Sequence, residues 1–325
     1  MVSQVHPILE QNDPRVKAAQ GAEHRFFEYY SLDYKTHYIE LDEPRIRIRI
    51  LEVGSGTPVL MVPGGVGDAW VFLPLMSHLE GYRMIAINRP GGGMSEGIDH
   101  RAVDMQQLAI NTFSSVLDYF DLTRVPVIGN SMGGLWSFWF ALNQPDRVSA
   151  LVQLGAPALI LDTSAPLPMR LLSVPMFNRL LVRMMVPKNH EKARELPVFL
   201  GHPRAVGENW PEAAAECSYQ FPRLPNYETS WLSLMERVLN LRGVKSDVQL
   251  GEKELRRVHQ PTLFIWGRRD PFGSLDAARR AQKVVPRAEL HEVGVGHLPW
   301  WDEANECARL IRAFLSKKAS IADAE

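Results

Sequence analysis

The 325-residue sequence has few cysteines, almost no net charge and no apolar run of about 18 residues or more. Its two cysteines, Cys217 and Cys307, exclude a disulfide framework and a multi-cysteine metal site, which indicates a reducing compartment. The 36 basic and 37 acidic side chains leave a net charge of −1, so no general attraction for nucleic acid or anionic lipid is expected. The missing apolar run excludes a membrane-spanning helix.

Targeting and cofactor signals are also missing. The first segment, MVSQVHPILEQNDPR, does not lead from basic residues into an apolar stretch, so we expect no signal peptide and a soluble, cytoplasmic protein. The histidines and carboxylates lack metal-ligand spacing such as H-E-x-x-H, and Gly91-Gly92-Gly93 lacks the lysine and spacing of a phosphate loop. We therefore expect no metal and no cofactor, and a small molecule as the binding partner. The chain could form a homodimer.

What is present is an ordinary globular composition, with 46% apolar and 22% charged residues. Residues 1–35 are polar and mixed, which indicates an N-terminal extension lying against the body, with a helix around residues 18–30. The run RIRIRI at residues 45–50 alternates strictly and places three arginines on one face. We interpret it as a half-exposed strand protected by charge near a sheet edge, rather than as an anion-binding patch.

Short apolar runs then alternate with stretches of helical length. The strand-like runs are residues 58–62, 83–87, 125–128, 150–154, 261–266 and 288–293, and a closing helix follows at residues 302–315. The first four of these runs are largely apolar and suit strands that are buried on both faces. The alternation predicts an α/β fold with a mainly parallel sheet and helices on both faces, built from residues 36–157 and 256–325.

Residues 158–255 break this alternation and predict a helical cap. The segment is rich in proline and methionine and contains no convincing strand. Within it, residues 176–186 predict a helix in which Arg179 and Arg183 share one face. The rest of that helix is covered by Phe177, Leu180, Leu181 and Met184. Such a helix could lie on a membrane surface, but we favour a cap element whose apolar side faces a pocket.

The sharpest motif is GNSMGG at residues 129–134, which follows an apolar run and opens a helical stretch. This is the G-x-S-x-G pattern in a strand–turn–helix context, which indicates a nucleophilic serine, Ser131. Gly129 and Gly133 leave room for the close backbone approach that such a tight turn needs. The turn also places Ser131 at a helix N-terminus, where free N–H groups stabilise developing negative charge.

A serine hydroxyl needs a base, and the base needs an acid to orient it. His297 lies in the glycine-rich loop after the last predicted strand, where ligands meet an open α/β sheet, whereas His6, His24 and His202 are interpreted as structural or surface residues. Asp270 follows the next-to-last strand and is the favoured acid, with Asp302 as the alternative. The chain order Ser, Asp, His is the order of α/β-hydrolases.

Acyl transfer also needs donors for an oxyanion. The backbone N–H of Met132, just after the serine, is one candidate, and Gly65 in the loop PGGVGDAW at residues 63–70 is the other. Glycines in that loop let the main chain come close to a bound carbonyl. Residues expected to contact the substrate are Gly64, Trp70, Trp136 and Leu298.

From about residue 36 onward, the chain resembles the α/β-hydrolase superfamily with a helical cap. The matching motifs are GNSMGG, PGGVGDAW, NRPGGGMS (residues 88–95), WGRRDP (266–271) and GVGHLPWWDEAN (294–305). The resemblance implies Ser131 as nucleophile, Asp270 as acid and His297 as base, with Gly65 and Met132 as oxyanion donors. Two departures are Pro63, where many relatives have a histidine that braces the oxyanion loop, and Asn88, where an aspartate is usual.

These residues predict a serine hydrolase of the carboxylesterase kind. The cap is rich in apolar and aromatic residues, which favours an ester with an apolar acyl or aryl group. The alternatives are hydrolysis of a carbon–carbon bond in a vinylogous diketone acid, with an arginine such as Arg89 or Arg179 as a carboxylate anchor, and cleavage of a lactone or an amide. A non-catalytic ligand-binding protein on the same scaffold is a further alternative.

Overall fold

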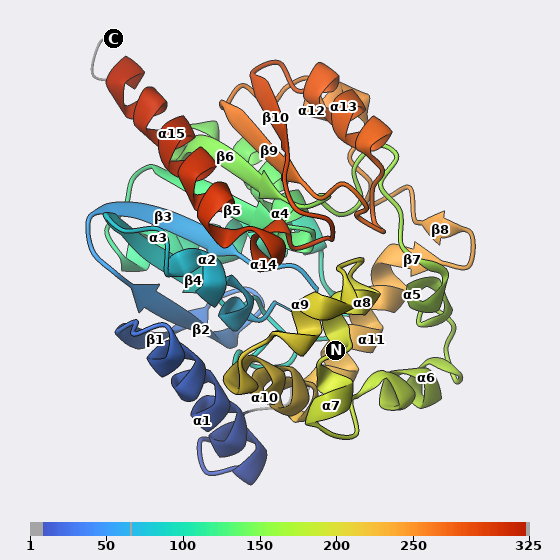
Figure 1. Ribbon diagram of the computed structural model, residues 1–325. Coiled ribbons are helices and arrows are strands. Elements are labelled where there is room, and N and C mark those ends of the chain that lie inside the picture. Colours follow the sequence, from blue (N-terminus) through green and yellow to red (C-terminus); the bar gives the residue numbers. More distant parts are fainter. Residues whose placement is uncertain (1–8, 66, 323–325) are drawn as a thin grey trace.

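The computed structural model describes residues 9–65 and 67–322, and its centre is an eight-stranded sheet (Figure 1). The strand order is β1-β2-β4-β3-β5-β6-β9-β10. The pairings of β1 with β2 and of β2 with β4 are antiparallel, and the others are parallel. The strands are β1 (Tyr34–Leu41), β2 (Ile46–Val53), β3 (Thr57–Val62), β4 (Tyr82–Ile87), β5 (Val125–Asn130), β6 (Val148–Leu154), β9 (Thr262–Trp266) and β10 (Ala288–Glu292). The predicted mainly parallel sheet is confirmed.

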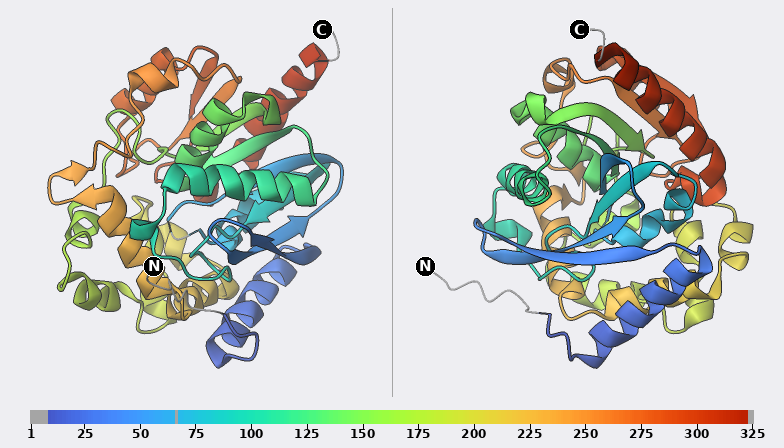
Figure 2. Two further views of the ribbon diagram at one scale, coloured as in Figure 1. Left: turned by 180° about the vertical axis from the view of Figure 1, so that it is seen from behind. Right: turned by 90° about the vertical axis from the view of Figure 1, so that its left-hand side faces the viewer.

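Helices cover both faces of the sheet, as the alternating pattern predicted (Figure 2). They are α1 (Pro14–Tyr29), α2 (Leu73–Met76), α3 (Met105–Tyr119), α4 (Met132–Asn143), α12 (Glu252–Leu255), α13 (Leu275–Val284), α14 (Pro299–Asp302) and α15 (Ala304–Ala322). Two apolar cores result. One contains Phe113 of α3 and Phe140 of α4, and the other contains Phe26 of α1, Phe72 and Phe314 of α15. Short 3₁₀ helices lie at Ala69–Phe72, His100–Ala102, Pro145–Arg147 and Phe221–Arg223.

The N-terminal segment is more closely integrated than the sequence suggested. Helix α1 begins after Asp13, whose carboxylate accepts a hydrogen bond from the Arg15 N–H, and β1 forms the outer strand of the sheet. Helix α1 covers the arginine face of β2, where Arg49 is only 3% exposed and its guanidinium lies 2.6 Å from the Glu23 carboxylate. The prediction of a half-exposed arginine face is therefore wrong at Arg49, because an element distant in sequence covers it.

The segment between β6 and β9 forms a group of short helices over the carboxyl ends of the parallel strands (Figure 1). These are α5 (Leu167–Leu171), α6 (Asn178–Met185), α7 (His190–Ala193), α8 (Leu196–Phe199), α9 (Arg204–Glu208), α10 (Glu212–Gln220) and α11 (Tyr227–Val238). A short hairpin of two-residue strands, β7 (Leu239–Asn240) and β8 (Gly243–Val244), lies within the segment, where the sequence showed no convincing strand. We call residues 158–255, without α12, the cap.

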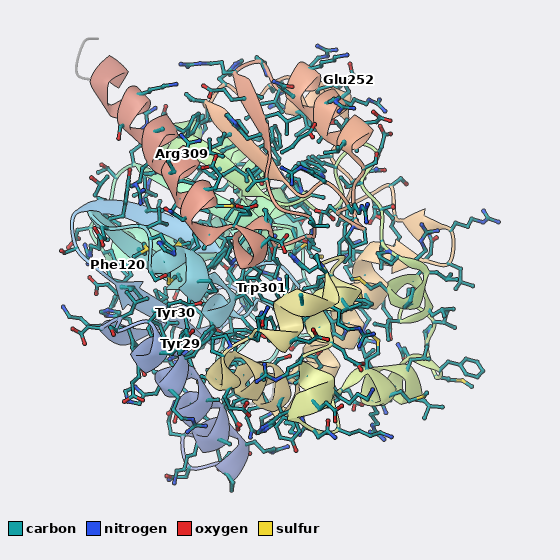
Figure 3. The ribbon with its side chains drawn as sticks, viewed as in Figure 1. Tyr29, Tyr30, Phe120, Glu252, Trp301 and Arg309 are labelled. Atoms are coloured by element: carbon teal, nitrogen blue, oxygen red, sulfur yellow. The ribbon has the colours of Figure 1, made fainter. Side chains whose placement is uncertain are left out.

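Several side chains join the cap to the core. The Asn226 amide donates hydrogen bonds to the carbonyls of Gly93 and Ser95, and His100 Nδ1 lies 3.2 Å from the carbonyl of Ser230 in α11. Burial lowers the pKa of His100 to about 3, so this histidine is neutral and can donate from Nδ1. Trp301 of α14 packs edge to face against Trp210 of the cap, with 4.6 Å between the ring centroids (Figure 3).

Candidate active site

Ser131 occupies the turn between β5 and α4. Its backbone is strained, with φ of 51° and ψ of −112°, a conformation that L-residues rarely adopt. A Cβ on Gly133 would collide with the backbone of Val62, and a Cβ on Gly129 would lie 2.7 Å from the carbonyl oxygen of Gly133. The two glycines of the motif are thus needed for this turn, which presents Ser131 to a cavity under the cap.

Asp270 and His297 meet at the carboxyl ends of β9 and β10. The Asp270 Oδ2 atom lies 2.8 Å from His297 Nδ1, and both side chains are buried. Oδ2 also accepts the N–H of Ala156, and Oδ1 accepts the N–H of Phe272, so the carboxylate is held at both oxygens. With its Nδ1 directed at Asp270, the imidazole can present an unprotonated Nε2 to a proton donor.

The alternative acid, Asp302, has a different partner. It lies 2.8 Å from Nδ1 of His202 and accepts the N–H groups of Val295 and Gly296. Burial opposes ionisation, but the His202 and backbone hydrogen bonds outweigh it and lower the pKa of Asp302. His202 Nε2 in turn accepts the N–H of Leu298. Asp302 and His202 therefore hold the loop that carries His297. The sequence gives no local signal for this second pair.

The glycine loop after β3 passes directly against the serine. A Cβ on Gly64 would lie 2.7 Å from the Cβ of Ser131, and Gly65 has a φ of +48°. Residue 66, in the middle of the loop, lies outside the described residues. The Ala69 N–H donates to the side-chain oxygen of Asn88, so the residue that replaces the usual aspartate holds one end of this loop.

Arg89 holds the same loop from below. Its guanidinium donates to the carbonyl oxygens of Pro63, Gly64 and Gly65, and it is buried beneath them. It also lies over the ring of Trp136, 5.0 Å from the ring centroid. Burial lowers the pKa of Arg89 to about 9. The sequence predicted a loop without its histidine brace, and the structure places an arginine side chain where it can hold that loop.

The cavity above Ser131 has a volume of about 800 Å³. Six of the predicted site residues line it: Gly64, Gly65, Trp70, Ser131, His297 and Leu298. The first and last of these are separated by about seven-tenths of the sequence. From the cap, apolar side chains line it: Met169, Met184, Leu196, Phe199, Phe221 and Trp231. A second cavity of about 50 Å³ also reaches Ser131 and Gly65 and includes Met132.

Trp136 does not lie with the other predicted substrate contacts. It is fully buried in the core beside Phe113, beneath Arg89. The prediction for Trp136 is wrong because its side chain projects from α4 into the core between the sheet and α3, away from the cavity.

Asp68 is an ionisable group of the cavity that the sequence did not single out. Its carboxyl is half-buried where the glycine loop enters the 3₁₀ helix at Ala69–Phe72. Burial raises the pKa of Asp68 to about 7. Among the described lining residues, the cations other than His297 are Lys188, Lys192 and Arg204, and all three are exposed. Among the described residues that line this cavity, Asp68 is thus less exposed than Glu195 and the three cations, which lie at the solvent side.

Comparison with known proteins assigns the fold to a family. A family model described as alpha/beta hydrolase fold matches residues 57–304. A relative from Cupriavidus pinatubonensis, a 2-hydroxy-6-oxononadienedioate/2-hydroxy-6-oxononatrienedioate hydrolase, is 28% identical over 282 residues, covering 84% of this chain and 92% of its own length. A hydrolase of the same name from Klebsiella pneumoniae is 26% identical, over 87% of this chain and 96% of its own.

Solved structures of the same fold include different hydrolases. Carboxylesterase CesB from Bacillus subtilis superposes with a TM-score of 0.70 at 16% identity, covering 93% of this chain and 98% of that one. The meta-cleavage product hydrolase from Pseudomonas fluorescens superposes with a TM-score of 0.68 at 19% identity, covering 86% and 97%. This chain belongs to the alpha/beta hydrolase fold family, and it is a hydrolase.

The described residues contain no helix long and apolar enough to cross a membrane. Within the same part of the chain, histidine, cysteine and carboxylate side chains do not gather into a group that could hold a metal ion.

Proposed function

We propose that the chain is a serine hydrolase that cleaves carboxylic esters with an apolar acyl or aryl part. The observation that carries the proposal is the Asp270–His297 pair, 2.8 Å between Oδ2 and Nδ1, whose His297 lines the same cavity as a strained Ser131. In the first half-reaction, His297 Nε2 takes the serine proton while Oγ attacks the ester carbonyl carbon. The N–H groups of Gly65 and Met132 stabilise the oxyanion, and the alcohol leaves with the proton from His297.

In the second half-reaction, water replaces the alcohol. His297 takes a proton from water, the hydroxide attacks the acyl carbon, and Ser131 leaves with that proton, which releases the carboxylic acid. Asp270 holds the imidazole and stabilises its cationic form in both halves. The two cavities that reach Ser131 differ in volume, about 800 Å³ against about 50 Å³, which supports an ester with one large and one small part.

The lining of the cavity favours a neutral ester over a charged substrate. Asp68 lines the cavity, and above about pH 7, where its carboxyl is ionised, it would repel a second carboxylate placed beside it. The guanidinium of Arg89 is directed at three loop carbonyls, so it does not serve as the carboxylate anchor suggested from the sequence. The other anchor considered there, Arg179, is exposed on α6 and is not among the described lining residues.

Carbon–carbon bond hydrolysis is the second candidate, and the names of the two curated relatives support it more directly than they support ester cleavage. A dicarboxylate substrate would have to place its charges near Lys188, Lys192 or Arg204 at the solvent side of the cavity. Comparing kcat/KM for a 2-hydroxy-6-oxo-dienedioate with that for a neutral p-nitrophenyl ester decides between the two. A larger value for the dienedioate would overturn the ester proposal. Matched lactones and amides extend the same comparison.

The proposed nucleophile is tested with Ser131→Ala. We expect hydrolysis of short p-nitrophenyl esters to fall by at least about 10⁴-fold, because the acyl-enzyme can no longer form. Ser77→Ala serves as the matched control, because the Ser77 hydroxyl donates a hydrogen bond to the carbonyl of Pro74 and does not line the cavity. A fluorophosphonate should label the native protein and the control but not the Ser131 variant. A native protein that neither turns over esters nor reacts with the probe would be a binding protein on this scaffold.

A further inference from the structure

The outer side of the cap carries a row of exposed apolar side chains. Helices α5 and α6 lie next to each other at the outer edge of the cap in Figure 1 and in the left view of Figure 2. The exposed residues of this row are Leu167 (62%), Leu171 (39%), Met176 (86%), Phe177 (64%), Leu180 (62%) and Met184 (69%). We call them the α5–α6 face. An apolar surface of this extent on one side of a protein marks an interaction site.

Helix α6 shows that this exposure is not incomplete packing. Asn178 and Val182, four residues apart, are buried, and the Asn178 amide donates to Glu236 of α11. The side of α6 that packs is therefore occupied by these two residues. Leu180 and Met184, also four residues apart, point to solvent. The sequence interpretation that the apolar side of this helix faces a pocket is correct only in part, since Met184 lines the cavity edge and Leu180 does not.

The α5–α6 face continues into the catalytic cavity. Met184, Met185 and Val198 are each at least 40% exposed, and each also lines the cavity above Ser131. Met169, between Leu167 and Leu171, lines the same cavity. An apolar chain on the outer surface can therefore reach the cavity along apolar side chains.

The charge around this face differs from that of the whole chain. Between Leu167 and His190 the sequence has four cations, Arg170, Arg179, Arg183 and Lys188, and no aspartate or glutamate. Arg183 is paired with Glu228 of α11 at 3.0 Å. A second copy docking by the same face would bring these cations against their equivalents, whereas an anionic surface would complement them. With Arg183 paired to Glu228, the local excess of positive charge rests on Arg170, Arg179 and Lys188, and the net charge of −1 for the full chain conceals it.

We propose that the α5–α6 face docks on the surface of aggregated anionic lipid, and that the cavity takes its ester substrate from that surface. The combination of exposed apolar side chains with flanking arginine and lysine is the one that holds helices in a lipid interface. The inference rests on the proposed ester hydrolysis and names its substrate class, esters with a lipid chain. The chemical step is unchanged: the acyl group passes to Ser131 and then to water.

The test is co-sedimentation of the full chain with vesicles of phosphatidylcholine and phosphatidylglycerol in equal parts. We expect the native protein to sediment with them, and less so with phosphatidylcholine alone or at high salt. The double variant Phe177→Gln, Leu180→Gln removes two exposed apolar side chains without changing charge. It should partition at least about tenfold more weakly. Tyr29→Gln, on α1 and away from this face, is the matched control (Figure 3).

Hydrolysis assays separate this inference from the function on which it rests. The double variant should hydrolyse a water-soluble p-nitrophenyl ester at the native rate and lose about tenfold on a long-chain ester presented in the vesicles. Three results would overturn the docking proposal: a native protein that stays in the supernatant, a double variant that binds vesicles as the native does, or a native dimer that the double variant dissociates. Vesicle binding without any ester hydrolysis would instead refute the proposed function.

Discussion

Arg89 connects the sequence pattern to the geometry of the candidate oxyanion site. One buried guanidinium reaches the carbonyls of Pro63, Gly64 and Gly65, and its planar fork suits several acceptors at once. Holding these carbonyls fixes the backbone around Gly65, whose N–H is a proposed oxyanion donor. We therefore assign Arg89 a positioning role, since it touches the loop and not the reacting atoms.

Arg89→Met should lower kcat for p-nitrophenyl esters by about 10²–10³-fold while KM changes little, because a displaced oxyanion donor weakens only the transition state. Arg89→Lys keeps the charge but not the fork and should recover part of the loss. Steady-state kinetics on all three proteins provide the measurement. A change confined to KM, or a lysine variant no better than the methionine variant at equal thermal stability, would contradict the positioning role.

At the level of elements, α1 links three parts of the molecule. Its Glu23 pairs with Arg49 of β2, its Arg25 lies 3.8 Å from Glu216 of α10, and Phe26 and Phe27 enter the core. A helix that the sequence marks as a peripheral extension thus contacts both the sheet and the cap.

Removing one partner of the buried pair should be costly. Glu23→Ala leaves the Arg49 guanidinium buried without its counter-charge, and we expect the free energy of unfolding to fall by about 3–5 kcal/mol. The matched control is Glu306→Ala, which breaks an exposed pair with Arg309 on α15 and should change stability by less than about 1 kcal/mol. Urea denaturation of both variants measures the difference. Equal losses would show that burial of the Glu23–Arg49 pair does not matter.

Local sequence was sufficient for most of the elements and for the residues that meet at the cavity. The inner strands β3, β4, β5, β6 and β9 are short apolar runs, and the turn at Ser131 has a glycine signature that its geometry requires. The loops of Asp270 and His297 follow the last two strands, and parallel strands end at one edge of a sheet. These are short-range or topological constraints, so they can be seen in one sequence.

Long-range contacts could not be predicted in this way. The burial of Arg49 depends on α1, the pairing of His202 with Asp302 joins the cap to a loop 100 residues later, and the direction of Trp136 depends on which side of α4 meets the sheet. None of these three features is marked in the sequence by a periodic pattern or a motif. The outward apolar side of α6 is similar, because an amphipathic pattern gives two faces but not which of them packs.

For the molecule as a whole, ionisation of Asp68 in the cavity makes the free energy of unfolding depend on pH. Its pKa is 3.8 as a free side chain and about 7 in the folded protein, because burial disfavours the charged form. Between these values the folded protein holds more protons than the unfolded chain. The contribution of Asp68 to stability is therefore complete below its unfolded pKa and is lost as the pH rises through about 7.

Asp68→Asn removes this dependence. Relative to the native protein, the variant should gain about 2 kcal/mol of unfolding free energy between about pH 5 and pH 8, less than the full shift implies because the carboxyl faces an open cavity. Other titrating groups are common to both proteins and cancel in the comparison. Denaturant titrations at the two pH values give the difference. A gap between the proteins that is independent of pH would show that Asp68 titrates normally.

The cap interrupts a single connection, the one between the neighbouring parallel strands β6 and β9. Because β6 and β9 are adjacent, the positions of the strands do not depend on the length of the segment that connects these two. During evolution, the whole insertion could therefore be replaced by another, which would change substrate specificity and leave the proposed catalytic residues in place. Such an exchange would need to rebuild the contacts that join the cap to the core, among them those of Asn226, His100, His202 and Trp301.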